Sequence, residues 1–206
     1  MIYAIAKWVI KMFLHTYHRV EVYGMEDLPR QGSLIVVGNH VSYLDSFYIA
    51  SLLPRPVHFM ARQESFAHPI TRRLLHFAGA FPVNREKPEI RTMRTALRYL
   101  EQQEVVGIFP EGGIDGDGSF QEIKQGASYL ATKGNCPILP VYIEGTQIAL
   151  PEGQKWIKPI KITLYVGNPI IPPDVGSSKE KQLLVSEQIQ QQLRSLKNGI
   201  DLDQTG

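Results

Sequence analysis

The sequence predicts an α/β protein, a single domain with a mostly parallel or mixed central sheet flanked by helices and preceded by an N-terminal amphipathic helix. Short runs rich in β-branched residues alternate along the chain with segments of helical periodicity, which is typical of sheets whose strands are connected by helices. Glycine and proline mark the boundaries between these segments. A chain of 206 residues buries one sizeable core and does not require a second domain.

The composition excludes several classes of protein. Hydrophobic residues make up 43% of the chain and charged residues 20%, values that disfavour disorder and a polytopic membrane protein. The formal net charge of +2 gives no support for nucleic acid as a partner, since nucleic-acid-binding domains are usually far more basic. Cys136 is the only cysteine, which excludes an internal disulfide and a cysteine-based zinc site and is consistent with a reducing compartment.

The N-terminal segment is the predicted amphipathic helix. Residues 1–14 are strongly apolar, but two lysines interrupt them and the stretch is shorter than the roughly 20 residues of a spanning helix. No basic region precedes it and no small-residue cleavage site follows, so we do not expect a secretory signal. Four polar residues fall at helical spacing, namely Lys7, Lys11, His15 and His18. A helix over residues 1–18 would either lie in a membrane interface or pack on its own domain, and the sequence leaves both open.

The elements beyond this helix follow in order. We expect strands at 20–23, 33–38, 57–61, 79–83, 105–109, 137–143 and 161–166, where short apolar or β-branched runs are bounded by turn residues. We expect helices at 43–53, 68–78, 88–103, 124–134 and 178–197, where apolar residues recur at helical spacing. The last helix is rich in Gln, Glu and Lys, so we expect it to be a solvated surface helix followed by a frayed polar tail.

The strand at 33–38 ends directly on Asn39 and His40. Ligands bind at the carboxyl ends of strands in parallel α/β sheets, so we expect His40 to lie in a site. Asp45 follows five residues later, an offset of about 140° on a continuous helix, so the two meet only if His40 precedes the helix and Asp45 reaches back from its first turn. The carboxylate would then fix the imidazole tautomer and leave the other nitrogen free as a base. Ser42 lacks the G-x-S-x-G elbow of a hydrolase nucleophile.

Later strands also end in polar residues. One ends with Asn84 and Arg85, and an arginine at a strand end is suited to bidentate recognition of phosphate. The alternative there is a surface ion pair with a neighbouring glutamate. Another strand leads into Glu111 and Gly112, which places a carboxylate that can accept hydrogen bonds from hydroxyls at a glycine-rich turn. The segment at 137–146 is flanked by prolines and has the apolar pattern of a core strand.

Four blocks of residues, in order and in spacing, resemble those of a known enzyme family. They are Asn39-His40-x4-Asp45, Val83-Asn84-Arg85-Glu86, Phe109-Pro110-Glu111-Gly112 and Pro137-x2-Pro140-Val141. Through them the chain resembles the glycerolipid acyltransferase family typified by lysophosphatidate (1-acylglycerol-3-phosphate) acyltransferase, over about residues 20–170. The run Phe120-x3-Lys124-x-Gly126-Ala127 is also similar to the family's F-K-x-G-A region, with a longer gap before the lysine.

The resemblance implies a role for each matching residue. His40 would be the general base and Asp45 its orienting partner. Substrate binding would fall to Asn39, Asn84, Arg85, Glu111, Gly112 and Lys124, with Arg85 holding the acceptor's phosphate. Pro140 would be structural or would shape the acyl pocket.

The resemblance also implies a reaction and a place for it. A fatty acyl group would pass from acyl-CoA or acyl-carrier protein to a hydroxyl of a lysophospholipid, with no cofactor and no metal. The partners would be the donor, the lipid acceptor and a membrane surface. The protein would be peripheral or monotopic on the cytoplasmic face of a membrane, with residues 1–18 as an interface helix and residues 19–206 as the acyltransferase domain.

One departure from the family pattern concerns the acceptor. The family often continues the third block as F-P-E-G-T-R-S, whereas this chain continues with Gly113, Ile114 and Asp115. Ile114 cannot contact an anion, and Asp115 with Asp117 would repel phosphate, so an acceptor without a phosphate is an alternative. Two rivals from other classes are a thioester or lipid hydrolase that uses the same histidine with water, and a non-catalytic lipid-binding module.

Overall fold

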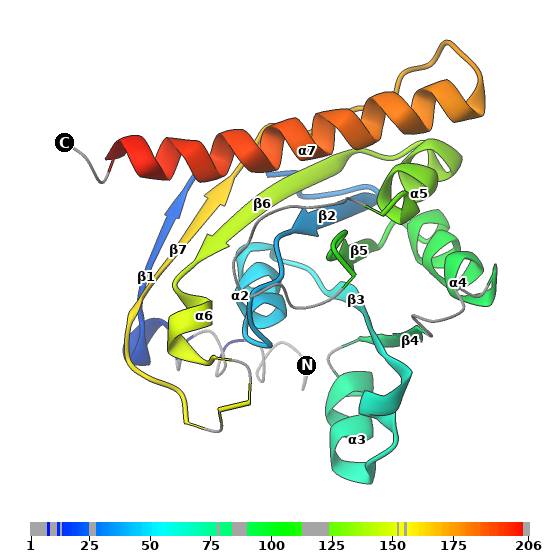
Figure 1. The fold of residues 1–206 in the computed structure, drawn as a ribbon. Helices are drawn as coiled ribbons and strands as arrows, with labels where there is room; N and C mark the ends of the chain where they lie inside the picture. Colours follow the sequence, from blue (N-terminus) through cyan, green and yellow to red (C-terminus); the bar gives the residue numbers. More distant parts are fainter. Residues whose placement is uncertain are drawn as a thin grey trace.

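The structure, a computed structural model, describes most of the chain. The described residues are 8, 12, 14–24, 28–77, 79–83, 90–112, 124–151, 153–154 and 156–203. They form a seven-stranded sheet with helices on both of its faces (Figure 1). The predicted fold class is therefore confirmed.

The elements agree closely with those predicted. The strands are β1 (Arg19–Tyr23), β2 (Leu34–Gly38), β3 (Val57–Arg62), β4 (Phe81–Val83), β5 (Val105–Ile108), β6 (Ile138–Glu144) and β7 (Lys161–Val166). The helices are α2 (Asp45–Leu52), η1 (Gln63–Phe66), α3 (Pro69–Phe77), α4 (Ile90–Glu101), α5 (Gly126–Gly134), α6 (Thr146–Ala149) and α7 (Ser178–Asp203). The sequence does not predict η1 or α6, since four residues are too few to display a helical period.

The strand order explains why polar residues gather at one edge. The order is β1-β7-β6-β2-β5-β3-β4, and the last five of these strands run parallel to one another. β7 pairs antiparallel with β6, and β1 pairs parallel with β7, so the sheet is mixed. The carboxyl ends of β6, β2, β5, β3 and β4 consequently share one edge, which is where α/β proteins bind ligands.

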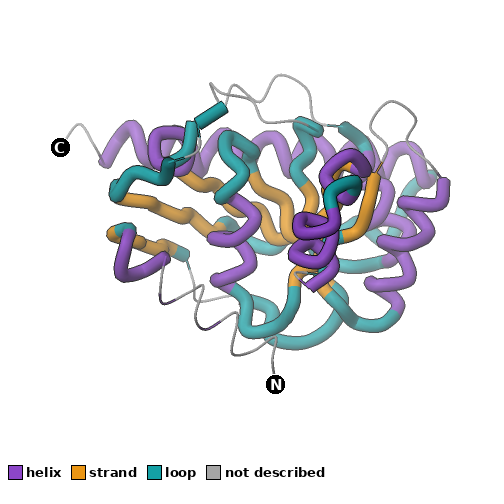
Figure 2. The backbone as a smooth tube through the Cα atoms, turned by 90° about the horizontal axis from the view of Figure 1, so that it is seen from below, coloured by secondary structure: helices purple, strands orange, loops and turns teal. Residues whose placement is uncertain are grey.

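The alternation of side chains along β2 divides the core into two layers. Ile35 and Val37 pack toward α4, α5 and α7, whereas Leu34 and Val36 pack into the layer that contains α2. Figure 2 shows the strands lying between these helices. Since β2 is buried on both faces, it is an apolar run without polar alternation, as expected of a central parallel strand.

Helix α7 is only partly the solvated helix that its composition predicts. Val185, Ile189 and Leu193 follow one another at steps of four residues and are completely buried in the layer with α4 and α5. Most of the remaining residues of the helix are exposed. The prediction therefore missed a narrow apolar stripe that fixes α7 along the sheet.

The predicted N-terminal helix lies largely outside the described residues. Trp8, Met12 and residues 14–17 are helical, and His15 is exposed as the polar stripe predicts. His18 is a correction, because only 1% of its surface is exposed and it packs into the domain. Within the described part of the chain, every helix is too short or too polar to cross a lipid bilayer.

Candidate active site

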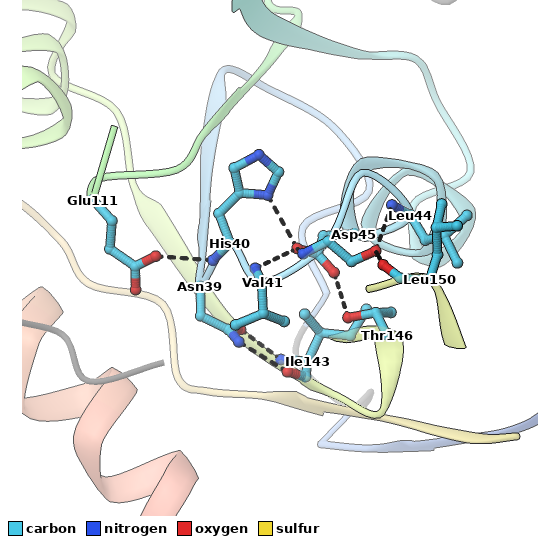
Figure 3. Close-up of polar contacts among 10 residues, drawn as sticks. Asn39, His40, Val41, Leu44, Asp45, Glu111, Ile143, Thr146 and Leu150 are labelled. Carbon is cyan, nitrogen blue, oxygen red and sulfur yellow. Dashed lines mark hydrogen bonds and ion pairs between the residues drawn. The ribbon is translucent and has the colours of Figure 1, made fainter. Parts of the chain in front are cut away.

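Three neighbouring strand ends build the site. His40 follows β2, Glu111 follows β5, and Thr146 follows β6, and β2 lies between the other two strands in the sheet. Figure 3 shows these residues around the turn that leads from β2 into α2. Sequence reasoning places His40 and Glu111 at this edge, and the strand order brings them together.

The imidazole of His40 contacts the carboxylate of Asp45. His40 Nδ1 lies 3.0 Å from Asp45 Oδ2, and the acidic side chain is completely buried at the first turn of α2. A carboxylate oxygen accepts, so Nδ1 carries the hydrogen and Nε2 is left as the acceptor nitrogen of the neutral ring. The five-residue spacing allows this contact because His40 lies in the turn before α2 and Asp45 lies in the first turn of the helix.

Further donors hold the carboxylate in place. The backbone N–H groups of Val41 and Ser42 each donate to Asp45 Oδ2 at 2.8 Å, and the hydroxyl of Thr146 donates to Oδ1 at 2.5 Å. The turn therefore wraps around the side chain that follows it. Both carboxylate oxygens are engaged, so Asp45 cannot rotate away from His40 without losing hydrogen bonds in a buried environment.

The hydroxyl of Ser42 is used within the fold. It donates to the carbonyl of Leu150 at 3.0 Å, and the residue is 1% exposed. This geometry agrees with the absence of a nucleophile elbow in the sequence. The thiol of Cys136 is also buried, and burial raises its pKa to about 12, which keeps it protonated at neutral pH.

An aromatic stack covers one face of the imidazole. The ring of Phe109 lies parallel to that of His40, with centroids 4.0 Å apart and an interplanar angle of 11°. Phe59 stacks in turn on Phe109 at 5.4 Å. Gly107 makes room for this stack, because a Cβ there would lie 2.4 Å from the Phe59 ring. The ring plane of His40 is therefore set by packing as well as by Asp45.

The second nitrogen of the ring remains available. Among the described residues, none hydrogen-bonds to Nε2, and 11% of the His40 side chain is exposed. Figure 3 shows this nitrogen on the side of the ring away from Asp45. A neutral imidazole held in this way presents a lone pair that can accept a proton from a bound molecule.

Asn39 joins two strands rather than facing the edge. Its carboxamide donates to the carbonyl of Ile143 at 2.8 Å and accepts from the N–H of Ile143 at 2.7 Å. The residue is fully buried. The side chain thus continues the pairing of β2 with β6 beyond Gly38 and fixes the start of the His40 turn.

Glu111, Gly112 and Lys124 form the neighbouring group. Glu111 Oε2 accepts from the backbone N–H of His40 at 3.1 Å. Gly112 has a φ of +76°, and a Cβ there would lie 2.4 Å from Lys124 Nζ, so the lysine side chain passes directly over the glycine. The N–H of Lys124 also donates to the carbonyl of Pro110 at 3.0 Å. Lys124 thus lies against Pro110 and Gly112, next to the glutamate that contacts His40.

Two predicted site residues lie outside the described part of the chain, namely Asn84 and Arg85. They directly follow β4, which runs parallel to β3. Ile114, Asp115 and Asp117 also lie outside the described residues.

Sequence reasoning missed Thr146 and Phe109. Thr146 directly follows Gly145, whose φ of +93° turns the chain at the end of β6, and a Cβ there would lie 2.3 Å from the Lys161 carbonyl oxygen. A hydroxyl residue after a glycine at a strand end is a signal that could have found it. Phe109 belongs to a block quoted above, but its contact with His40 depends on how β5 pairs with β2.

The fold and the site define an α/β protein with a histidine–aspartate pair at the carboxyl edge of its sheet. A family model described as Acyltransferase matches residues 19–144, more than half of the chain. The protein therefore belongs to the acyltransferase family and is an acyltransferase, as the four sequence blocks predict.

Individual relatives agree with this assignment. The chain is 29% identical to the 1-acyl-sn-glycerol-3-phosphate acyltransferase of Bacillus subtilis (strain 168), over 93% of this chain and 95% of that protein. It is 30% identical to the protein of the same name from Limnanthes alba, over 75% of this chain and 56% of that protein. A crystal structure of the 1-acyl-sn-glycerophosphate (LPA) acyltransferase PlsC from Thermotoga maritima is similar, with a TM-score of 0.73, 26% identity and coverage of 93% of this chain and 80% of that chain.

Proposed function

We propose that this acyltransferase moves a fatty acyl group from an acyl thioester, acyl-CoA or acyl-carrier protein, to a hydroxyl of a lysophospholipid such as 1-acylglycerol-3-phosphate. The relatives named for that acceptor support the choice of substrate. The observation that carries the mechanism is the 3.0 Å contact of His40 Nδ1 with Asp45, which leaves Nε2 open at the edge of the sheet.

The reaction is direct transfer. His40 Nε2 removes the proton of the acceptor hydroxyl while its oxygen attacks the thioester carbonyl carbon. The C–O bond forms, the C–S bond breaks, and the thiol leaving group takes the proton back from the imidazolium. Asp45 stabilises the imidazolium that exists between these steps. General-base assistance of this kind contributes about 10²–10⁴-fold to the rate.

The environments of Ser42 and Cys136 do not favour a covalent acyl-enzyme at either residue. The Ser42 hydroxyl donates to the Leu150 carbonyl, and the Cys136 thiol is buried with a raised pKa. Both observations support attack by the acceptor itself.

The acceptor is bound around the same edge. We assign its phosphate to Arg85, with Asn84 beside it, because an arginine fork recognises phosphate oxygens in a bidentate manner. Glu111, Gly112 and Lys124 bind the acceptor next to His40, where the carboxylate can accept from glycerol hydroxyls and the ammonium can meet an anion. Asn39 contributes by holding the His40 turn against β6, since its carboxamide is bonded to Ile143.

An acceptor without phosphate is a second candidate. The segment after Gly112 carries Ile114, Asp115 and Asp117, where the family often has a basic residue. Two carboxylates near the acceptor would oppose a phosphate and would tolerate a neutral lipid alcohol.

The cellular setting follows from a lipid acceptor. We place the enzyme on the cytoplasmic face of a membrane, peripheral or monotopic. Residues 1–18 would form the interface helix and residues 19–206 the acyltransferase domain.

The purified protein, labelled acyl thioesters and a panel of lyso-acceptors with and without phosphate test this proposal. Acylated lysophosphatidate is the expected product, formed only when donor and acceptor are both present. Free fatty acid released at equal rates with and without acceptor would show a hydrolase instead. Product formed only from phosphate-free acceptors would overturn the choice of lysophosphatidate.

A further inference from the structure

Helix α4 carries a row of arginines that has no part in the transfer chemistry described above. Arg91, Arg94 and Arg98 recur at helical spacing and fall within about 60° of one another around the axis, so they share one face. All three are exposed, and among the described residues no acidic side chain pairs with any of them. This arginine row therefore presents its positive charges to solvent.

A groove of about 530 Å³ borders the arginine row. It lies among α4, α5 and α7, with α5 packed between the other two helices (Figure 1). Arg94 lines the groove together with three apolar residues of α4, of which Ile90 is 72% exposed and Met93 and Leu97 are half-buried. An exposed apolar side chain and an apolar groove beside a charged rim are typical of a site that binds another protein.

The charge of these helices is mostly positive. The basic residues of α4 and α5 are Arg91, Arg94, Arg98 and Lys133, and their only acidic residue is Glu101, in the last turn of α4. Lys124 lies just before α5 and is exposed, and the first turn of α7 adds two lysines and one glutamate. A surface of this sign attracts an acidic partner and speeds its association.

The groove lies close to the edge of the sheet that carries His40. α4 leads into the start of β5 and α5 into the start of β6, so the first turns of both helices lie near the carboxyl ends of the strands. Lys124, which directly precedes Gln125 of the groove, passes over Gly112. Glu111 then accepts from the backbone N–H of His40. A flexible arm can cross from the groove to His40 along this short series of contacts.

The length of the arginine row indicates a protein rather than a small anion. Arg91 and Arg98 are seven residues apart, which is about 10 Å along the helix axis. A single phosphate group meets one or two guanidinium groups. Carboxylates on one face of an acidic helix recur at the same spacing as the arginines and can meet the whole row.

We infer that the arginine row and the groove beside it bind an acidic acyl-carrier protein, the donor that holds its acyl chain on a thioester arm. Carboxylates of a carrier helix meet the arginines, an apolar side chain enters the groove, and the arm passes Lys124 to reach His40. This inference rests on the proposed function and deepens it, because it assigns a place to one of the two donors. Acyl-CoA has no protein body to dock there.

Binding is measured first, without acyl transfer. The probe is the fluorescently labelled acyl-carrier protein of Bacillus subtilis with an empty thiol arm, since a relative of this chain comes from that organism. By fluorescence anisotropy, Arg94→Glu raises the Kd by about tenfold or more, because an attraction becomes a repulsion, and Arg94→Lys recovers most of the affinity. Folding of each variant is checked by circular dichroism.

Arg194→Glu is the matched control. Arg194 is exposed on α7, about 18 Å along the helix axis from Gln182 of the groove, and its replacement changes the net charge by the same amount. We expect its Kd for the carrier protein to stay at the wild-type value. Equal affinities of Arg94→Glu, Arg194→Glu and the wild type would overturn the inference, as would a wild type that does not bind the carrier protein.

Turnover with two donors separates docking from chemistry. With acyl-carrier protein as donor, Arg94→Glu raises KM by about tenfold and leaves kcat near wild type. With acyl-CoA of the same chain length, both constants stay near wild type. An equal rise of KM with both donors would contradict docking of a protein, since it would mean a contact with the shared arm or damage to the site. Absence of transfer from either donor would refute the proposed function, whereas the anisotropy result decides the docking by itself.

Discussion

His18 and His40 are both buried, and both contact side chains of α2. His18 uses both ring nitrogens, accepting from Tyr48 and lying within hydrogen-bond distance of the Lys158 carbonyl. His40 uses Nδ1 toward Asp45, and among the described residues none bonds to Nε2. His40 is also the more exposed of the two, with 8% of its surface accessible compared with 1% for His18.

The difference separates a structural histidine from one that can do chemistry. The first ring links the end of the N-terminal helix, α2 and the loop before β7. The second is held on one side by a carboxylate and on its face by Phe109, and it offers its remaining nitrogen at the strand edge. Burial alone does not distinguish the two roles, whereas the use of the second nitrogen does.

Replacement by alanine should affect the rate of transfer at His40 and the stability of the fold at His18. His40→Ala is expected to lower the rate of transfer by at least about 10²-fold while leaving the melting temperature and vesicle binding near wild type. His18→Ala is expected to lower the stability by about 1–3 kcal/mol, because it leaves Tyr48 and the Lys158 carbonyl unpaired, while the folded protein still acylates a dispersed acceptor. Retention of more than a tenth of wild-type turnover by His40→Ala would contradict the assigned role.

Asp45→Asn keeps the shape of the side chain and removes its charge. The amide group cannot accept from all the donors that meet Asp45, and it cannot stabilise an imidazolium. We expect a fall in kcat of about 10²-fold or more, measured with saturating donor and acceptor. A variant that folds normally and loses less than tenfold would show that the carboxylate does not serve the base.

Thr146→Val tests the residue that sequence reasoning missed. The substitution is nearly isosteric and deletes the hydroxyl that donates to Asp45 Oδ1, a hydrogen bond to a charged group worth about 1.5–3 kcal/mol. We expect kcat to fall by about tenfold with little change in KM, and Thr146→Ser to restore it. Failure of the serine variant to recover activity would assign the effect to packing.

The smallest effect is expected at Cys136. Its pKa is raised to about 12 by burial, so at pH 8 only about one thiol in ten thousand is ionised. Native protein should resist iodoacetamide at that pH, and Cys136→Ala should keep wild-type turnover. Rapid alkylation with loss of activity would instead point to a covalent acyl-enzyme.

Much of the fold was predictable because the central strands are buried on both faces. β2 is apolar throughout, and β6 is almost wholly buried up to its last residue, Glu144. Both are bounded by turn residues, so their positions follow from the local pattern. Two features of the helices were not predictable from the sequence. The buried stripe of Val185, Ile189 and Leu193 is narrow within a mostly polar helix, and His18 has a helical spacing that fits a polar stripe equally well.

Some contacts of the site were predictable from the sequence and others were not. The contact of His40 with Asp45 is local in sequence, so its spacing and the strand-to-helix transition predict it. Thr146 is separated from Asp45 by 101 residues, and their contact requires knowing that β6 lies beside β2. The stack with Phe109 likewise depends on the pairing of β5 with β2, which no local pattern specifies.

The most direct test of the account is the position of the proton on His40. Nitrogen-15 spectra of histidine-labelled protein, with the six histidines assigned by substitution, report it at a pH where the ring is neutral. We predict hydrogen on Nδ1, toward Asp45, and an unprotonated Nε2. Hydrogen on Nε2 with a bare Nδ1 would leave no base facing the acceptor and would contradict the mechanism.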